Sequence, residues 1–286
     1  MKAIAAALVV LFAGAATPTK VPVGQWTYGL AASGGSVWTG SLTSGDVIRI
    51  DPSTGKVLKR IPAGVRVFNL VAAPGAVWAV GNASGTVTRI DSRTGRVTST
   101  VPVGAAPYDA EWGFGSLWVA SSGEGTVWRI TGGKVVKKIK IGIEPNGLTA
   151  YGGALWVSDH TIGKVVRIDP ATNRITGTVH LPGADWITGY RGSLYVSQET
   201  DVVTRIDART LKVTGSVKTA RNPLGSAIVG GRLWVPCIDA NTIVVVDPST
   251  MKVTARRPGG PSPIVVLRAY GHTWVSHTLA NYLSRY

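Results

Sequence analysis

The sequence contains little cysteine and histidine and few acidic residues. Its one cysteine, Cys237, cannot form a disulfide within the chain, so an oxidising compartment is tolerated but not used for stability. Four histidines without any Gly-x-Ser-x-Gly segment give nucleophilic catalysis little support. Fifteen Asp and Glu stand against thirty Lys and Arg, a formal net charge of +15, which favours anionic polymers and surfaces as partners.

Long apolar runs and helical periodicity are also missing. The longest apolar stretch, residues 3 to 16, has about 14 residues, too few to cross a bilayer about 30 Å thick as a helix. One lysine precedes it and the small-residue sequence Ala-Gly-Ala ends it, a pattern typical of a secretory signal. We therefore expect residues 1–17 to be a signal peptide cleaved near Ala15. The mature chain is then periplasmic or extracellular, without a transmembrane segment; a retained N-terminal anchor is the alternative.

Internal repetition is what the sequence has in abundance. Seven segments place an aromatic residue three positions after a Gly, as in GSVWTG and GALWVS, and they recur every 38 to 40 residues. The aromatic residues are Trp38, Trp78, Trp118, Trp156, Tyr195, Trp234 and Trp274. Because these residues recur in every unit, we expect them to pack between units rather than to bind a ligand.

Each repeat unit contains four short strands. The aromatic strand is followed by a second alternating strand that ends in an Asp-led turn, as in VIRIDPSTG and VVRIDPATN. A third strand such as KVLKRIPAG follows, then a Gly or Pro corner and a fourth strand that leads to the next unit. Four strands per unit of about 40 residues predict an all-β, seven-bladed β-propeller.

The two ends of the chain indicate how the ring closes. The last unit stops at Tyr286 without its outermost strand, whereas the segment from Thr19 to Gly24 matches the outer-strand endings and precedes the first complete unit. We expect this N-terminal strand to pair with the last blade, which leaves no long open sheet edge. The prediction is one propeller domain over residues 18–286, and a monomer.

The repeats resemble those of the YVTN-type and virginiamycin B lyase-like seven-bladed propellers, whose units have the form LWV…G.V.RIDP.TG.V…VPVG..P. The resemblance implies an exported binding propeller; some members associate with DNA, and a neighbouring branch contains metal-dependent lyases that open streptogramin B antibiotics. That branch carries LWFTE, whereas Trp156 is followed here by VSD, Trp234 by VPC and Trp274 by VSH. The RIDPSTG turns favour the YVTN-type side.

The charged residues are expected to separate between the two faces of the propeller. The turn residues Asp51, Asp91, Asp169, Asp207 and Asp247 belong to one face, and the remaining acids fall near the loops of the other, where the channel opens. Arginines recur two residues before four of these turn aspartates. Because residues i and i+2 share a strand face, we expect a ladder of Arg and Asp side chains.

Two sites are predicted at the channel mouth. Non-repeating residues offer stacking faces and polar groups to a small molecule, glycan or peptide. The ligand-binding candidates are Trp26, Phe68, Tyr108, Asp109, Asn146, Asp159, Asp185, Trp186 and Asn222. A ring of blades could also supply oxygen ligands to Mg²⁺ or Ca²⁺, with Glu111, Glu144 and Glu199 as the metal candidates beside these acids. Solvated loop carboxylates are the structural alternative.

Three functions follow from these sites. The first is an exported, non-catalytic binding module with its ligand at the channel mouth. The second is a metal-dependent lyase or lactone-opening enzyme in which His160 or His277 acts as general base. The third is a propeller that binds DNA or another polyanion through its basic surface, although no nucleic-acid motif is present.

Overall fold

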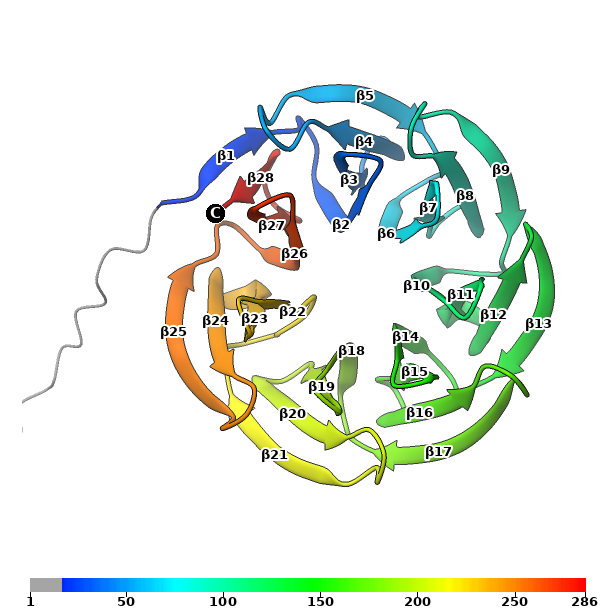
Figure 1. The fold of residues 1–286 in the computed structure, drawn as a ribbon, viewed down its shortest axis with the longest axis vertical. Helices are drawn as coiled ribbons and strands as arrows, with labels where there is room; N and C mark the ends of the chain where they lie inside the picture. The colour runs from blue at the N-terminus through cyan, green and yellow to red at the C-terminus, as the bar shows by residue number, and fades with distance from the viewer. Residues whose placement is uncertain (1–16) are drawn as a thin grey trace, which may run out of the picture.

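The computed structural model describes residues 17–286, whose 28 strands form seven four-stranded antiparallel sheets. The sheets stand around a central axis as the blades of a propeller (Figure 1). The predicted all-β, seven-bladed architecture is confirmed. Residues 1–16 lie outside the described part, so the signal peptide over 1–17 and its cleavage near Ala15 stay predictions. Within residues 17–286, no helix has the length and apolar character needed to cross a membrane.

We number the blades 1 to 7, starting from the blade that contains β2. The innermost strands are β2 (Thr27–Ser33), β6 (Val67–Ala73), β10 (Pro107–Gly113), β14 (Pro145–Tyr151), β18 (Ala184–Tyr190), β22 (Ala227–Val229) and β26 (Pro263–Ala269). The second strands are β3 (Ser36–Ser41), β7 (Ala76–Gly81), β11 (Ser116–Ser121), β15 (Ala154–Asp159), β19 (Ser193–Gln198), β23 (Arg232–Cys237) and β27 (His272–His277).

The outer half of each blade completes the sheet. The third strands are β4 (Asp46–Ile50), β8 (Thr86–Asp91), β12 (Thr126–Thr131), β16 (Lys164–Asp169), β20 (Val202–Asp207), β24 (Thr242–Asp247) and β28 (Tyr282–Arg285). The outer strands are β5 (Val57–Pro62), β9 (Val97–Pro102), β13 (Lys134–Lys140), β17 (Arg174–His180), β21 (Val213–Lys218), β25 (Lys252–Pro258) and β1 (Thr19–Pro22).

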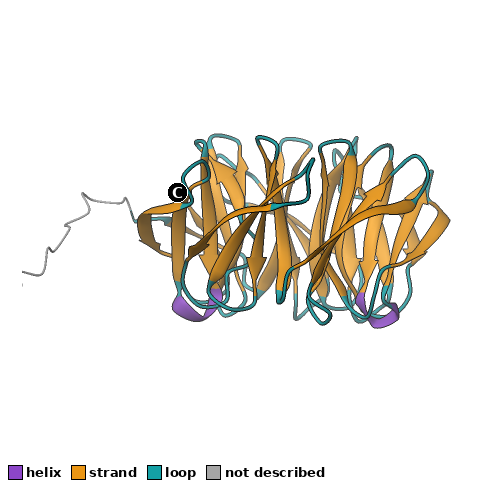
Figure 2. Ribbon diagram, turned by 90° about the horizontal axis from the view of Figure 1, so that it is seen from below, coloured by secondary structure: helices purple, strands orange, loops and turns teal. Residues whose placement is uncertain are grey.

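The propeller has two different faces. Two short 3₁₀ helices, Ser122–Glu124 and Ile238–Ala240, follow second strands and lie on one face, seen as the lower edge in Figure 2. We call this the mouth face; it also carries the loops that lead into the innermost strands. The opposite face, called the turn face, carries the turns between third and outer strands.

The ring closes through the first and last strands, as predicted. β1 pairs antiparallel with β28, from Thr19 opposite Arg285 to Pro22 opposite Tyr282 (Figure 1). The backbone N–H groups of Val23 and Gly24 then donate to the Asn281 carbonyl at 2.8 and 2.9 Å. Blade 7 therefore has the same four strands as its neighbours although they come from both ends of the chain.

The repeated aromatic residues lie buried between the blades. Trp38, Trp118, Trp156 and Trp274 are at most 1% exposed. In each of the four, the indole N–H donates to a carbonyl five residues earlier, at the end of the innermost strand, as in Trp118 to Gly113 at 3.0 Å. The Gly before the motif makes the tight turn, because it has a positive φ, 70° at Gly115.

The expected ladder of Arg and Asp side chains is wrong. The turn aspartates accept hydrogen bonds from backbone N–H groups of their own turns, as Asp51 does from Ser53 at 2.8 Å and Thr54 at 3.1 Å. The Ser53 hydroxyl, which donates to Asp51 at 2.6 Å, and these N–H groups lower the pKa of the Asp51 carboxyl. Four arginines instead donate to carbonyls in the turn of the next blade. The pairs are Arg49 to Arg93 (2.9 Å), Arg129 to Pro170 (2.6 Å), Arg205 to Ser249 (2.7 Å) and Arg285 to Ser53 (3.0 Å).

Three of these arginines, Arg49, Arg129 and Arg285, also lie over buried indoles. The Arg129 guanidinium lies 4.6 Å from the Trp118 ring centroid. Its Nε donates to Ser116, and the Nη1 that donates to Pro170 also donates to Asn173. A cation over an aromatic face is attracted by the ring quadrupole. Each such arginine therefore links two blades and closes the packing around a tryptophan.

Replacing this guanidinium tests its part in joining the blades. We expect Arg129→Met, which keeps most of the side-chain stem, to lower the free energy of unfolding by about 2 kcal/mol through lost hydrogen bonds and lost cation–π attraction. The control is Arg89→Met, because Arg89 bonds only to Thr98 of its own blade. Urea unfolding measures both variants, and equal losses would contradict an inter-blade role.

Candidate functional site

The innermost strands carry a bulge where they leave the mouth face. Pairing with the second strand skips from the first to the fourth residue, as from Thr27 to Leu30 and from Pro145 to Leu148. The second and third residues of these strands are therefore free of the ladder in blades 1, 2, 4, 5 and 7. In blade 3 only the second residue is free, because Asp109 pairs with Ala120. The second residues are Tyr28, Phe68, Tyr108, Asn146, Asp185 and Ile264. The mouth is thus aromatic over blades 1 to 3 and polar over blades 4 and 5.

The aromatic side of the mouth is a compact cluster of three rings. Tyr28 stacks on Phe68 with centroids 5.2 Å apart, and Tyr108 meets both edge-on at 6.1 and 5.4 Å. The hydroxyls of Tyr28 and Tyr108 share a 2.7 Å hydrogen bond. Burial raises the pKa of both phenols, so both stay protonated at neutral pH.

The polar side of the mouth centres on His160. Its Nε2 lies 3.4 Å from Glu144 Oε2 and 3.7 Å from Glu199 Oε1. The Thr161 hydroxyl donates to Glu144 at 2.6 Å. Burial raises the pKa of Asp185 to about 6, and the nearby imidazole of His160 partly opposes that shift. Blades 4 and 5 therefore place two glutamates beside one imidazole, with Asp185 near enough to interact with it electrostatically.

Three buried polar atoms of this cluster lack a partner. Among residues 17–286, no hydrogen bond is formed by Asn146 Oδ1, Asp185 Oδ1 or His160 Nδ1, although each atom is buried. Buried polar atoms in folded proteins are nearly always bonded to protein or water, because desolvating them unpaired costs about 1 to 3 kcal/mol. Three such atoms in two adjacent blades indicate a binding site for a polar ligand.

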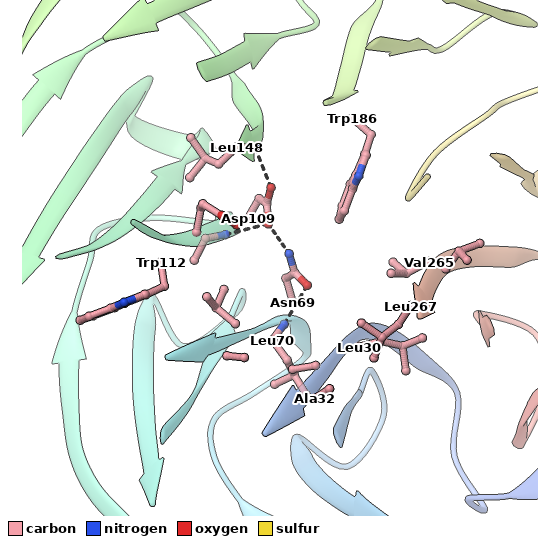
Figure 3. A pocket seen from close by; sticks show the side chains of 16 residues that line it. Leu30, Ala32, Asn69, Leu70, Asp109, Trp112, Leu148, Trp186, Val265 and Leu267 are labelled. Carbon is pink, nitrogen blue, oxygen red and sulfur yellow. Dashed lines mark hydrogen bonds between the residues drawn. The ribbon is translucent and has the colours of Figure 1, made fainter. Parts of the chain in front are cut away.

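A cavity of about 330 Å³ continues from this mouth along the channel. Figure 3 shows Asp109 inside it, accepting hydrogen bonds from the backbone N–H of Leu148 at 2.7 Å and from the Asn69 amide. Burial raises the pKa of Asp109 to about 7 despite these donors. Deeper on the same strand, burial and the charge of Asp109 raise the pKa of Glu111 to about 8.

Two predicted site residues form hydrogen bonds inside the protein instead of facing the mouth. Asp159, fully buried, accepts hydrogen bonds from the backbone N–H groups of Ile143 at 2.8 Å and Glu144 at 3.1 Å. His277 occupies the equivalent last position of its second strand, is fully buried, and shares a 2.9 Å hydrogen bond with Ser284. Burial lowers the pKa of His277 to about 4, so the ring is neutral. The structure gives both residues an internal role.

The remaining candidates separate by location. Trp26 is 49% exposed in the loop before β2 on the mouth face. Trp186 lines the channel cavity, where Figure 3 shows it across from Asp109. Asn222 forms a backbone turn: its φ is 56°, and its N–H and carbonyl bond to Thr200 and Ile238. Asn222 thus has a structural task that its sequence position did not reveal.

The predicted metal candidates do not form one donor set. In the described range 17–286, no group of three His, Cys, Asp or Glu side chains is placed to hold a metal ion. Glu144 and Glu199 flank His160, whereas Glu111 lies within the channel beside Asp109. The predicted Mg²⁺ or Ca²⁺ site therefore has no set of ligands in this part of the chain.

Two residues of the site were missed from the sequence, Tyr28 and Asn69. Both occupy repeat positions at which other blades carry a predicted residue: Tyr28 matches Phe68 and Tyr108, and Asn69 matches Asp109. Aligning the units by the start of the innermost strand, rather than by the tryptophan motif alone, would have found them.

Comparison with known proteins supports the fold. No protein-family model and no curated protein matches the sequence. Among solved structures, hydrazine synthase of Kuenenia stuttgartiensis is similar with a TM-score of 0.79 and 16% identity, over 96% of this chain and 98% of that chain. BamB from Moraxella catarrhalis is similar with a TM-score of 0.67 and 13% identity, over 90% and 80%. At these identities the likeness establishes a β-propeller.

Neutralising Glu111 tests the electrostatics of the channel. The unfolded chain releases this proton near pH 4.5 and the folded chain near pH 8, so the folded state loses stability as pH rises between these values. We expect Glu111→Gln to stabilise the protein by on the order of 2 kcal/mol at pH 8 and hardly at pH 5. Urea unfolding at both pH values measures this; Glu124→Gln, an exposed residue of the 3₁₀ helix in the same blade, is the control. An equal effect at both pH values would contradict the raised pKa.

Proposed function

We propose that this protein is a non-catalytic binding propeller that holds a small polar ligand at the mouth of its channel. The observation that carries the proposal is the set of three buried polar atoms without partners, Asn146 Oδ1, Asp185 Oδ1 and His160 Nδ1. A bound molecule that pairs with them would remove the cost of their burial. The seven-bladed scaffold supports this use, because its loops and strand ends can vary without altering the blades.

The chemistry of the mouth indicates what kind of ligand fits. The unpartnered oxygens of Asn146 and Asp185 are acceptors, so the ligand must offer hydrogen-bond donors. The ring cluster of Tyr28, Phe68 and Tyr108 on the other side favours a ligand with an apolar face. A sugar ring has both properties, hydroxyl donors at its edge and C–H groups on its face. We therefore infer that the ligand is a sugar unit of a glycan.

Exposed apolar side chains around the mouth face extend the surface available to a longer glycan. They lie on loops of blades 1, 2, 4 and 7, and they are Trp26, Val65, Ile143 and Leu279, between 49% and 61% exposed. Export of the mature chain to the periplasm or the cell surface belongs to this proposal and rests on the sequence of residues 1–17.

Catalysis receives less support from the geometry. The alternative of a metal-dependent lyase needs several oxygen or nitrogen ligands around one ion, and the described chain holds no such group of His, Cys, Asp or Glu. Of the two predicted bases, His277 is fully buried, whereas His160 remains at the mouth between Glu144 and Glu199. His160 is accordingly placed to bind and orient a ligand.

Binding of monosaccharides tests the proposal. We expect ligand-observed NMR saturation transfer from the protein to at least one of glucose, galactose and N-acetylglucosamine. Asp185→Asn, which replaces the carboxylate acceptor, should weaken that binding about tenfold, the value of one charge-assisted hydrogen bond. The control is Asp239→Asn, which removes one carboxylate from the exposed 3₁₀ helix on the same face. The proposal fails if no sugar binds or if both variants behave alike.

Binding of a polyanion is the second candidate, favoured by the outer strand β13. Lys134, Lys137, Lys138 and Lys140 are all exposed on this strand. Lysines that neutralise phosphates release counterions, so affinity for a 20-base-pair DNA duplex should fall at least about tenfold between 50 and 200 mM salt. Fluorescence anisotropy with the charge-reversed variant Lys137→Glu measures this. Affinity that is independent of salt would reject a polyanion site.

A further inference from the structure

One turn of the propeller is shorter than its counterparts. In blades 1, 2, 4, 5 and 6, a five-residue segment that begins with Asp leads from the third strand into the turn, as in DPSTG at 51–55. In blade 3 the corresponding segment is only TGG, residues 131–133, from the end of β12 to the start of β13. Gly132 and Gly133 have φ values of 58° and 78°, the left-handed conformation of a two-residue hairpin turn. The turn of blade 3 is therefore two residues shorter than the others, and it covers less of the neighbouring blade 2 on the turn face.

The side chains of blade 2 that face this gap have fewer partners than their counterparts. Arg89 occupies the repeat position of Arg49 and Arg129 but makes no bond to the next blade, donating only to Thr98 at 3.0 Å. The indole N–H groups of Trp38, Trp118, Trp156 and Trp274 each donate to a carbonyl, whereas that of Trp78 has no hydrogen-bond partner within residues 17–286. The indole N–H of Trp234, which lies beside Thr19, also has no partner in this range. Trp78 and Arg89 thus retain donors that other blades use internally.

A pocket of about 570 Å³ occupies the gap between blades 2 and 3. Its walls include the indoles of Trp78 and Trp112, and its polar side chains are Arg89, Lys134, Thr98 and Ser99. No Asp or Glu side chain lines the pocket in the described structure. The pocket opens on the turn face, whereas Asp185 and His160 lie at the mouth on the other face. It is therefore a separate site.

We propose that this pocket binds a small aromatic carboxylate. The lining offers two cations, Arg89 and Lys134, and indole N–H donors, which together select an anionic acceptor. The guanidinium of Arg89 presents paired donors that match the two oxygens of a carboxylate. The indoles of Trp78 and Trp112 provide apolar and aromatic contact for a flat ring. A cavity of this size lies within the range of small-molecule sites.

Titration with 2-naphthoate tests this site, with the neutral 2-naphthalenemethanol as the matched ligand. Isothermal titration calorimetry on the full chain should show binding of the carboxylate and at least about tenfold weaker binding of the alcohol, because the alcohol cannot pair with Arg89. Arg89→Gln should weaken 2-naphthoate binding about tenfold. The control is Arg167→Gln. Arg167 occupies the same repeat position in blade 4 and, like Arg89, donates to a threonine nine residues later, but it does not line the pocket.

A second variant lengthens the blade 3 turn so that the turn itself occupies the pocket. Replacing residues 131–133 by the five-residue sequence Asp-Pro-Ser-Thr-Gly restores the turn length of the other blades and should abolish binding of 2-naphthoate. Unchanged binding in this variant, equal effects of Arg89→Gln and Arg167→Gln, or equal affinity for acid and alcohol would each overturn the proposal. If the lengthened variant does not fold, the comparison of the two arginine variants decides alone.

Discussion

The buried indole between neighbouring blades is the contact on which the rest of this structure depends. A single four-stranded sheet cannot cover its own apolar faces, so each blade relies on the next to exclude water from Trp38, Trp118 or their equivalents. The guanidinium laid over the indole, as at Arg129, then bonds to the turn of the following blade. Packing and hydrogen bonding thus link the same two blades at the same place, and they do so from blades 1, 3 and 7.

The two proposed binding surfaces lie where the blades depart from the regular repeat. At the mouth, the bulge frees one or two residues of six innermost strands from the ladder, and their identities change from aromatic to polar around the ring. Enclosure raises the pKa of Asp185, Asp109 and Glu111, since a buried carboxylate is less stable than the neutral acid. At blade 3, a shortened turn leaves Trp78 and Arg89 without their usual cover. Both surfaces use the same rigid frame without altering it.

The sequence was sufficient to predict the fold because each of its signals is local and occurs many times. The spacing of the tryptophan motifs gave the number of blades, and the match of residues 19–24 to outer strands predicted the ring closure. Contacts across blades could not be read in this way. The arginines were assigned to Asp residues on their own strand because i and i+2 share a face, whereas the competing partners lie about 40 residues away in the next blade. Asp159 was assigned to the binding site because other blades carry different residues at its repeat position. In the structure its carboxylate holds the loop at Ile143 and Glu144.

Ring closure by β1 has a consequence for the order in which the protein is built. Thr19, among the first described residues to leave a ribosome, pairs with Arg285, next to the last residue of the chain. Bringing such distant segments together costs loop-closure entropy that no local hairpin can repay. The N-terminal strand must therefore wait, unpaired, until the remaining blades exist. Until then the growing protein is an open arc with an exposed edge at each end, and only the pairing of β28 with β1 turns that arc into a closed ring.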